Sequence, residues 1–150
     1  MNAIDWRNVG DGPKWIPVIT GVEEALGIPA GLLARMAYQE STFRPEVING
    51  TVASAPGALG ILQLMPQFFD AVRRPIPFDD DTVRTQIARA GIYLKQQYTR
   101  FGDWAEALAA YNYGPGNEEK YLEHRITGLP IETQNYVSKI LADVPVKAAA

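Results

Sequence analysis

The chain has 150 residues, of which 47% are hydrophobic, so it is long enough to fold around one sizeable apolar core. Its 14 basic and 17 acidic side chains give a formal net charge of -3 without any basic cluster, which argues against a nucleic-acid partner. No apolar run approaches the length needed to span a bilayer, and the absence of cysteine excludes disulfides and thiolate metal ligands.

Helical periodicity dominates the first third of the chain. Apolar residues at helical spacing predict a helix over residues 15–26, which Gly27 is expected to end. A second helix is predicted over residues 29–41, because Pro29 suits a first helical position. Pro45 then marks the exit of the chain from that helix.

The middle of the chain begins with irregular structure. Small residues, Gly and Pro predict a loop over residues 49–60, and a short helix is expected after Pro66, through Phe68, Phe69 and Val72. Residues 73–81 then form a connection. We predict that Asp81 caps the next helix, which the apolar spacing extends as far as Phe101. A metal site at the three aspartates of residues 79–81 is the alternative to a solvated cap.

The last third predicts three more helices. Gly102 and Asp103 form a stop and a new cap before an Ala-rich helix over residues 104–112, which is apolar nearly all round. Residues 114–116 break it, and helices over residues 118–125 and 132–143 complete the set. The expected fold is therefore all-α, or mainly helical α+β at most. It has about seven helices in a single domain over residues 1–150.

Glu40 lies on the apolar side of the second predicted helix. It follows Met36 by four residues and Leu33 by seven, so the three share a face, whereas Arg35 and Gln39 belong to a more polar face. A carboxyl group that loses water in this way has a raised pKa, which is what a general acid needs near neutral pH. The alternative is that Glu40 turns out to solvent at the end of the helix.

Four segments resemble one known family. Residues 39–43, Gln-Glu-Ser-Thr-Phe, resemble the Glu-Ser motif of the soluble lytic transglycosylases, which are related to goose-type lysozymes. Residues 57–66 resemble the family's Gly-Leu-Met-Gln segment, residues 110–116 its Ala-Tyr-Asn-x-Gly segment, and residues 129–137 its Glu-Thr-x-x-Tyr-Val segment. Any one of these matches is weak, but four in the right order are highly specific.

The resemblance implies a lysozyme-like catalytic domain in which Glu40 is the sole catalytic acid and base. It also implies a set of residues around the sugar site: Ser54, Gln63, Met65, Tyr111, Asn112, Glu132 and Tyr136. Glu132 is expected as a second carboxylate that supports the site. Each has a structural alternative: Met65 as core filler, and Tyr111 and Tyr136 as packing residues. Ser41, beside the catalytic position, either caps the helix end or acts directly.

The implied activity is cleavage of the β-1,4 bond between N-acetylmuramic acid and N-acetylglucosamine, leaving a 1,6-anhydro end, with no cofactor and no metal. The expected partners are peptidoglycan glycan strands, and the expected state is a monomer without membrane insertion. A hydrolytic muramidase is the nearest alternative. A non-catalytic glycan-binding or virion module is the alternative from a different class.

Such a protein is expected to act in the periplasm or cell wall, or as part of a bacteriolytic phage. The first seven residues hold no basic stretch followed by an apolar core, so no secretory signal is predicted in them. Either another export route or the removal of a leader accounts for this.

Overall fold

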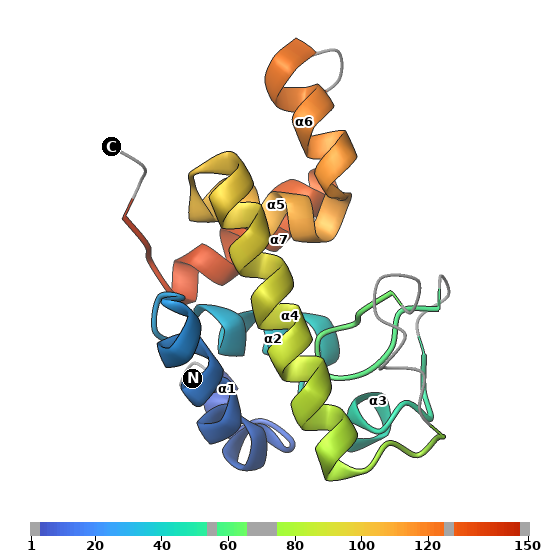
Figure 1. Cartoon of the computed structure of the whole chain (residues 1–150). Helices are drawn as coiled ribbons and strands as arrows, with labels where there is room; N and C mark the ends of the chain where they lie inside the picture. Colours follow the sequence, from blue (N-terminus) through green and yellow to red (C-terminus); the bar gives the residue numbers. More distant parts are fainter. Residues whose placement is uncertain (1–3, 54–56, 66–74, 125–127, 148–150) are drawn as a thin grey trace. The chain divides into compact units, whose positions relative to one another are not determined.

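The computed structural model describes residues 4–53, 57–65, 75–124 and 128–147. Within these ranges the regular structure is helical, apart from one isolated bridge between Leu59 and Leu64. The predicted all-helical class is therefore confirmed. The chain divides into two compact units, Met1–Gly91 and Ile92–Ala150, and the boundary falls inside the long helix α4 (Asp80–Phe101) (Figure 1).

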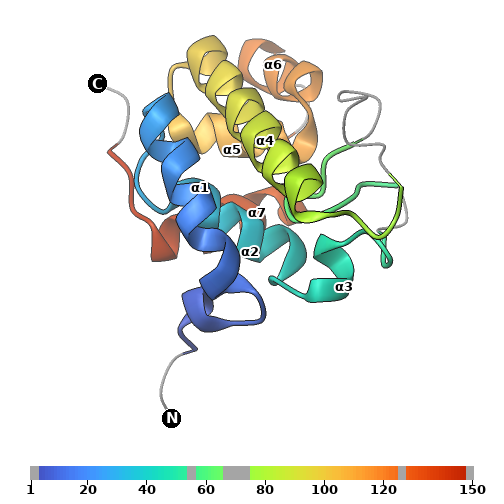
Figure 2. The same ribbon diagram turned by 60° about the horizontal axis from the view of Figure 1, so that its bottom comes forward.

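The first unit is built on two helices that lie side by side, α1 (Gly12–Leu26) and α2 (Leu32–Ser41) (Figure 2). The 3-10 helix η1 (Trp6–Asn8) packs against both, and a short helix, α3 (Pro45–Ile48), follows α2. The core of this unit includes large side chains with no exposed surface: Ile19, Leu32, Leu33, Met36, Phe43, Ile61, Leu62 and Ile87.

The ends of these helices differ in part from the sequence prediction. Gly27 ends α1 in a left-handed conformation with φ 69°, as predicted. However, α2 begins at Leu32 rather than at Pro29, because Gly31 precedes it with φ 87°, which is not a helical conformation. Pro45 does not simply end the preceding segment, since it is the first residue of α3. The helix expected after Pro66 lies outside the described residues.

Glu23 on α1 supplies the cap that α2 lacks. Gly31, which precedes α2, has no side chain that could cap the helix. Oε1 of Glu23 instead accepts a hydrogen bond from the N–H of Gly31 at 3.0 Å. Oε2 of Glu23 accepts from the N–H of Leu33 at 2.8 Å and from the N–H of Ala34 at 3.2 Å. The side chain is 2% exposed, and this burial raises the pKa of its carboxyl, although the three amides oppose the rise. A carboxylate also suits the positive end of the helix dipole.

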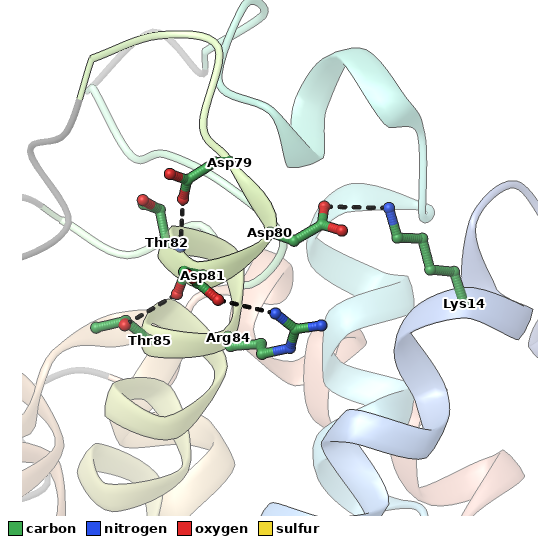
Figure 3. Close-up of polar contacts among 7 residues, drawn as sticks. All are labelled: Lys14, Asp79, Asp80, Asp81, Thr82, Arg84 and Thr85. Carbon is green, nitrogen blue, oxygen red and sulfur yellow. Dashed lines mark hydrogen bonds and ion pairs between the residues drawn. The ribbon is translucent and has the colours of Figure 1, made fainter.

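The three aspartates at the start of α4 have three different partners (Figure 3). Asp79 accepts a hydrogen bond from the N–H of Thr82 at 2.8 Å, which is the geometry of a helix N-cap. Asp80 pairs with Lys14 of α1 at 3.1 Å, and Asp81 pairs with Arg84 at 2.9 Å. The prediction that Asp81 is the cap is therefore wrong, because α4 begins at Asp80 and its cap is the residue before, Asp79.

Removal of the Asp79 carboxylate should destabilise the protein more than removal of the Asp81 carboxylate. We expect Asp79→Ala to lower the free energy of unfolding by about 0.5–2 kcal/mol, the usual value of an N-cap. Asp81→Ala is the matched control, and its exposed ion pair is worth about 0.2–0.5 kcal/mol. Urea unfolding followed by circular dichroism measures both values, and equal losses would contradict the cap assignment.

The second unit consists of the end of α4 and three further helices, α5 (Trp104–Tyr113), α6 (Pro115–His124) and α7 (Ile131–Asp143). Helix α5 packs against both α6 and α7, which agrees with its apolar character all round (Figure 1). Gly102 separates α4 from α5 with φ 74°, as predicted. The buried residues of this unit include Leu94, Trp104, Ala107, Leu108, Ala110, Tyr136 and Ile140.

Candidate functional site

Glu40 stands near the C-terminal end of α2, one residue before its last member, Ser41. Its side chain is half-buried, whereas Leu33 and Met36 on the same face are completely buried. The sequence analysis left two alternatives, a buried Glu40 and one turned out to solvent. The structure places Glu40 between them, at the edge of the core. A carboxyl group in such a position is partly shielded from water and still accessible to a ligand.

Arg35, which the sequence places with Gln39 on a more polar face than that of Glu40, is nevertheless buried. Its side chain is only 5% exposed. The guanidinium lies 4.9 Å from the ring centre of Tyr38 and 6.0 Å from that of Trp6, and it donates a hydrogen bond to Gln39 at 3.2 Å. The aromatic faces therefore stabilise a cation inside the first unit. Trp6 belongs to η1, far from Arg35 in sequence.

Ser41 has a structural role. Its side chain is 2% exposed, and its hydroxyl donates to the carbonyl of Ala37 at 2.8 Å while accepting from the N–H of Phe43 at 3.2 Å. Both bonds close the end of α2 immediately after Glu40. Of the two alternatives for Ser41, the structure supports the cap, which fixes the backbone on which the glutamate stands.

The backbone after Ser41 is strained. Thr42 and Phe43 both adopt left-handed conformations, with φ 52° and φ 53°, which bulky side chains rarely do. The ring of Phe43 is completely buried, 6.0 Å from that of Tyr38, and its carbonyl accepts the N–H of Asp11 at 2.9 Å. These contacts hold the strained reversal in place. Strain of this kind tends to occur at functional sites.

A closed turn carries the second motif. Leu59 and Leu64 exchange backbone hydrogen bonds of 2.9 and 3.0 Å, and the residues between them form the turn. Its apolar members, Ile61 and Leu62, are completely buried, so the turn is anchored in the core of the first unit. We refer to residues 59–64 as the motif turn.

Gln63 is the half-buried polar residue of the motif turn. Its backbone is left-handed, with φ 50°, and its side-chain amide donates to the carbonyl of Gly60 at 2.9 Å. Among the described residues, the non-glycine positions with positive φ are Thr42, Phe43 and Gln63. All three fall in the two motif segments of the first unit. This coincidence is independent of the sequence resemblance and points to the same residues.

For two other predicted site residues of the first unit, the structure does not decide between a role in the site and another role. Met65 is half-buried directly after the motif turn, which fits a role as core filler as well as one in the site. Ser54 lies outside the described residues, so its predicted role stays a prediction. The same holds for the sugar-site roles of Gln63 and Met65.

In the second unit, a side-chain hydrogen bond joins the third motif to the fourth. The hydroxyl of Thr133, near the start of α7, donates to the side-chain oxygen of Asn112 on α5 at 2.8 Å. Thr133 is 2% exposed. The bond fixes the orientation of the Asn112 amide. Sequence reasoning did not select Thr133, although it lies inside the fourth matching segment, beside Glu132.

The remaining predicted residues of this unit divide by exposure. Tyr111 is half-buried, and its ring centre lies 5.5 Å from that of Tyr93, whose pKa is raised by burial. Tyr136 is 5% exposed, in agreement with a packing role. Glu132 is exposed in the first turn of α7. Its predicted role as a supporting carboxylate stays a prediction.

A buried acid that the sequence reasoning missed lies on α6. Glu118 has no exposed surface, and the half-buried Glu106 of α5 is its acidic neighbour. Burial, followed by the hydrogen bond and the charge of Glu106, raises the pKa of Glu118 to about 8. A signal was present in the sequence, because Tyr121 and Leu122 follow at the spacing that places apolar residues on the same helix face.

Comparison with known proteins identifies relatives of the chain. The membrane-bound lytic murein transglycosylase F of Alcanivorax borkumensis is 32% identical over 139 residues, which cover 85% of this chain and 28% of that protein. The X-ray structure of an inactive mutant of the lytic transglycosylase Slt from Pseudomonas aeruginosa matches 84% of this chain and 22% of its own, with a TM-score of 0.66 and 24% identity. This chain therefore spans less than a third of either relative.

The structural match confirms the predicted lysozyme-like, all-helical fold. The Transglycosylase SLT domain family matches residues 17–129, which contain the first three motif segments and the start of the fourth. Because this match covers most of the chain, the protein belongs to the Transglycosylase SLT domain family.

Proposed function

We propose that this chain cleaves peptidoglycan glycan strands as a lytic transglycosylase, with Glu40 as its catalytic acid and base. Membership of the family and a relative named as a lytic murein transglycosylase support this activity. The observation that carries it is the local structure of the Glu-Ser segment. There, the half-buried Glu40 is the second-last residue of α2, and the helix ends at Ser41, directly before two left-handed residues.

The chemistry that we propose needs one carboxyl group and no metal. Glu40 donates a proton to the glycosidic oxygen as its bond to C1 of N-acetylmuramic acid breaks, and the N-acetyl group of that sugar stabilises the positive charge at C1. The Glu40 carboxylate then accepts the proton of the C6 hydroxyl, whose oxygen bonds to C1 and gives the 1,6-anhydro end. Attack by a tethered hydroxyl is favoured by proximity, and Glu40 is restored to its acidic form.

The product distinguishes this reaction from hydrolysis. We expect a digest of purified sacculi to contain muropeptides ending in 1,6-anhydro-N-acetylmuramic acid. These products are lighter by one water, about 18 Da, than the reducing ends that a muramidase leaves, because the sugar's own hydroxyl replaces the water nucleophile. Mass spectrometry of the digest measures this difference. Products with reducing ends alone would reassign the protein as a muramidase, and the absence of released fragments would favour a glycan-binding module.

The setting of the reaction follows from its substrate. We propose that the described units form one catalytic domain, active as a monomer, that acts in the periplasm or cell wall, for a bacterium or for a bacteriolytic phage. Across the part of the chain that the structure describes, none of the helices combines the length and apolarity required for a membrane span.

A further inference from the structure

The side chain of Gln86, on α4, is buried in a way that stability does not explain. It is 1% exposed, and within the described ranges neither its amide oxygen nor its amide nitrogen has a hydrogen-bond partner. Buried polar groups in native proteins are nearly always paired, because an unpaired one costs free energy. An apolar side chain of similar length would serve the core better, so the amide calls for another explanation.

Gln86 packs directly on the motif turn. A Cβ atom added to Gly60 would lie 2.3 Å from Oε1 of Gln86 and 3.0 Å from its Cδ, so the amide occupies the space that any other residue at position 60 would need. Gly60 itself is left-handed, with φ 83°. Its carbonyl accepts the side-chain amide of Gln63 at 2.9 Å. A chain of contacts therefore leads from Gln86 through Gly60 to Gln63.

We propose that Gln86 is a positioning residue for the motif turn, which it fixes at Gly60, so that the side chain of Gln63 is held in the orientation needed to bind the glycan. This inference rests on the proposed function, in which Gln63 contacts the sugar. The polar amide oxygen attracts the weakly polar Cα hydrogens of Gly60 and limits the freedom of a glycine-containing turn. An apolar side chain fills the same volume without that attraction.

The test variant is Gln86→Met, which keeps the length of the side chain and removes the amide. We expect the variant to fold with an unchanged or higher Tm, because a buried unpaired group is lost. On soluble glycan strands, KM should rise by up to about tenfold while kcat is retained, since one neutral hydrogen bond to substrate is worth up to that factor.

Gln97→Met is the matched control. Gln97 is a second glutamine of α4, 6% exposed, whose amide oxygen also has no hydrogen-bond partner among the described residues, and it belongs to the other unit. Its replacement should leave KM unchanged. In a Gln63→Ala background, Gln86→Met should raise KM no further, because Gln86 is proposed to act through Gln63.

A spectroscopic measurement separates this inference from the proposed function. The side-chain amide signals of Gln63, assigned by their loss in Gln63→Ala, should shift in Gln86→Met and stay in place in Gln97→Met. If the wild type releases no fragments from sacculi, the proposed function fails, while the amide signals still decide whether Gln86 positions Gln63. Unchanged Gln63 signals, or equal losses of Tm and activity in both methionine variants, would overturn the inference.

Discussion

Glu40→Gln is expected to lose activity on purified sacculi by about 10²–10⁴-fold, the usual contribution of general acid catalysis, while its fold is retained. The amide has nearly the same shape as the carboxyl group but cannot donate a proton to the glycosidic oxygen. Because Glu40 is half-buried at the end of α2, the substitution disturbs little packing. The rate of muropeptide release measures the loss, and circular dichroism checks the fold.

Glu46→Gln is the matched control for this experiment. Glu46 lies on α3, a few residues after Glu40, and its carboxylate pairs at 2.7 Å with Arg44, on a surface that is partly exposed. The same chemical change at Glu46 should leave the rate of muropeptide release close to that of the wild type. If Glu40→Gln were folded and fully active, Glu40 would have no part in the mechanism.

The second large effect concerns the dependence of stability on pH. At neutral pH the folded protein holds a proton on Glu118, whose pKa is raised to about 8, whereas in the unfolded chain the same carboxyl has its ordinary pKa of 4.5 and is ionised. The contribution of Glu118 to the free energy of unfolding is therefore fully present below its pKa in the unfolded chain. This contribution is lost as the pH rises through its pKa in the folded protein. We expect the free energy of unfolding to fall between these two pH values.

Glu118→Gln should remove much of this fall, because the glutamine stays neutral at every pH. At pH 9 the variant should be more stable than the wild type by on the order of 1–3 kcal/mol or more, because the wild type then buries an ionised carboxylate beside Glu106, which costs at least as much as an unsatisfied neutral group. Urea unfolding from pH 5 to pH 9 measures the effect.

Glu119→Gln provides the comparison for Glu118→Gln. Glu119 is the next residue of α6, with a side chain that is 44% exposed and paired with Arg100. Its stability curve should run parallel to that of the wild type. A Glu118→Gln curve that also ran parallel to the wild type would mean that Glu118 is ionised in the folded protein at neutral pH.

Local patterns predicted those helix ends that local residues determine. Gly27 and Gly102 end their helices as expected, since each provides the left-handed conformation in its own backbone. The capping of α2 was not predictable in this way. Its cap is the side chain of Glu23, which reaches α2 from another helix. The sequence analysis predicted Asp81 as the cap of α4, whereas the cap is Asp79, two positions earlier. Three consecutive aspartates are equally suitable as caps, so the sequence alone cannot distinguish them.

The same difference applies to the candidate site: some of its residues can be predicted from their own segment, and others depend on partners that are distant in sequence. Glu40 and Gln63 could be proposed from their segments, because each stands within a specific motif. The burial of Arg35 depends on Trp6, which is far from it in sequence, so it does not follow from its own segment. For Glu118, the segment indicates an apolar helix face, but the neighbouring acid, Glu106, lies on another helix. The strained backbone at Phe43 is likewise held by a distant partner, the N–H of Asp11.

The carboxylate of Glu23 has a consequence for how the first unit opens. The first amides of α2 are satisfied only while α1 is docked, so α2 cannot open or close as a separate helix without losing these bonds. In hydrogen exchange, the amides of Leu33 and Ala34 should therefore share the opening free energy of α1. The helix that carries Glu40 is therefore expected to open together with α1 rather than by itself.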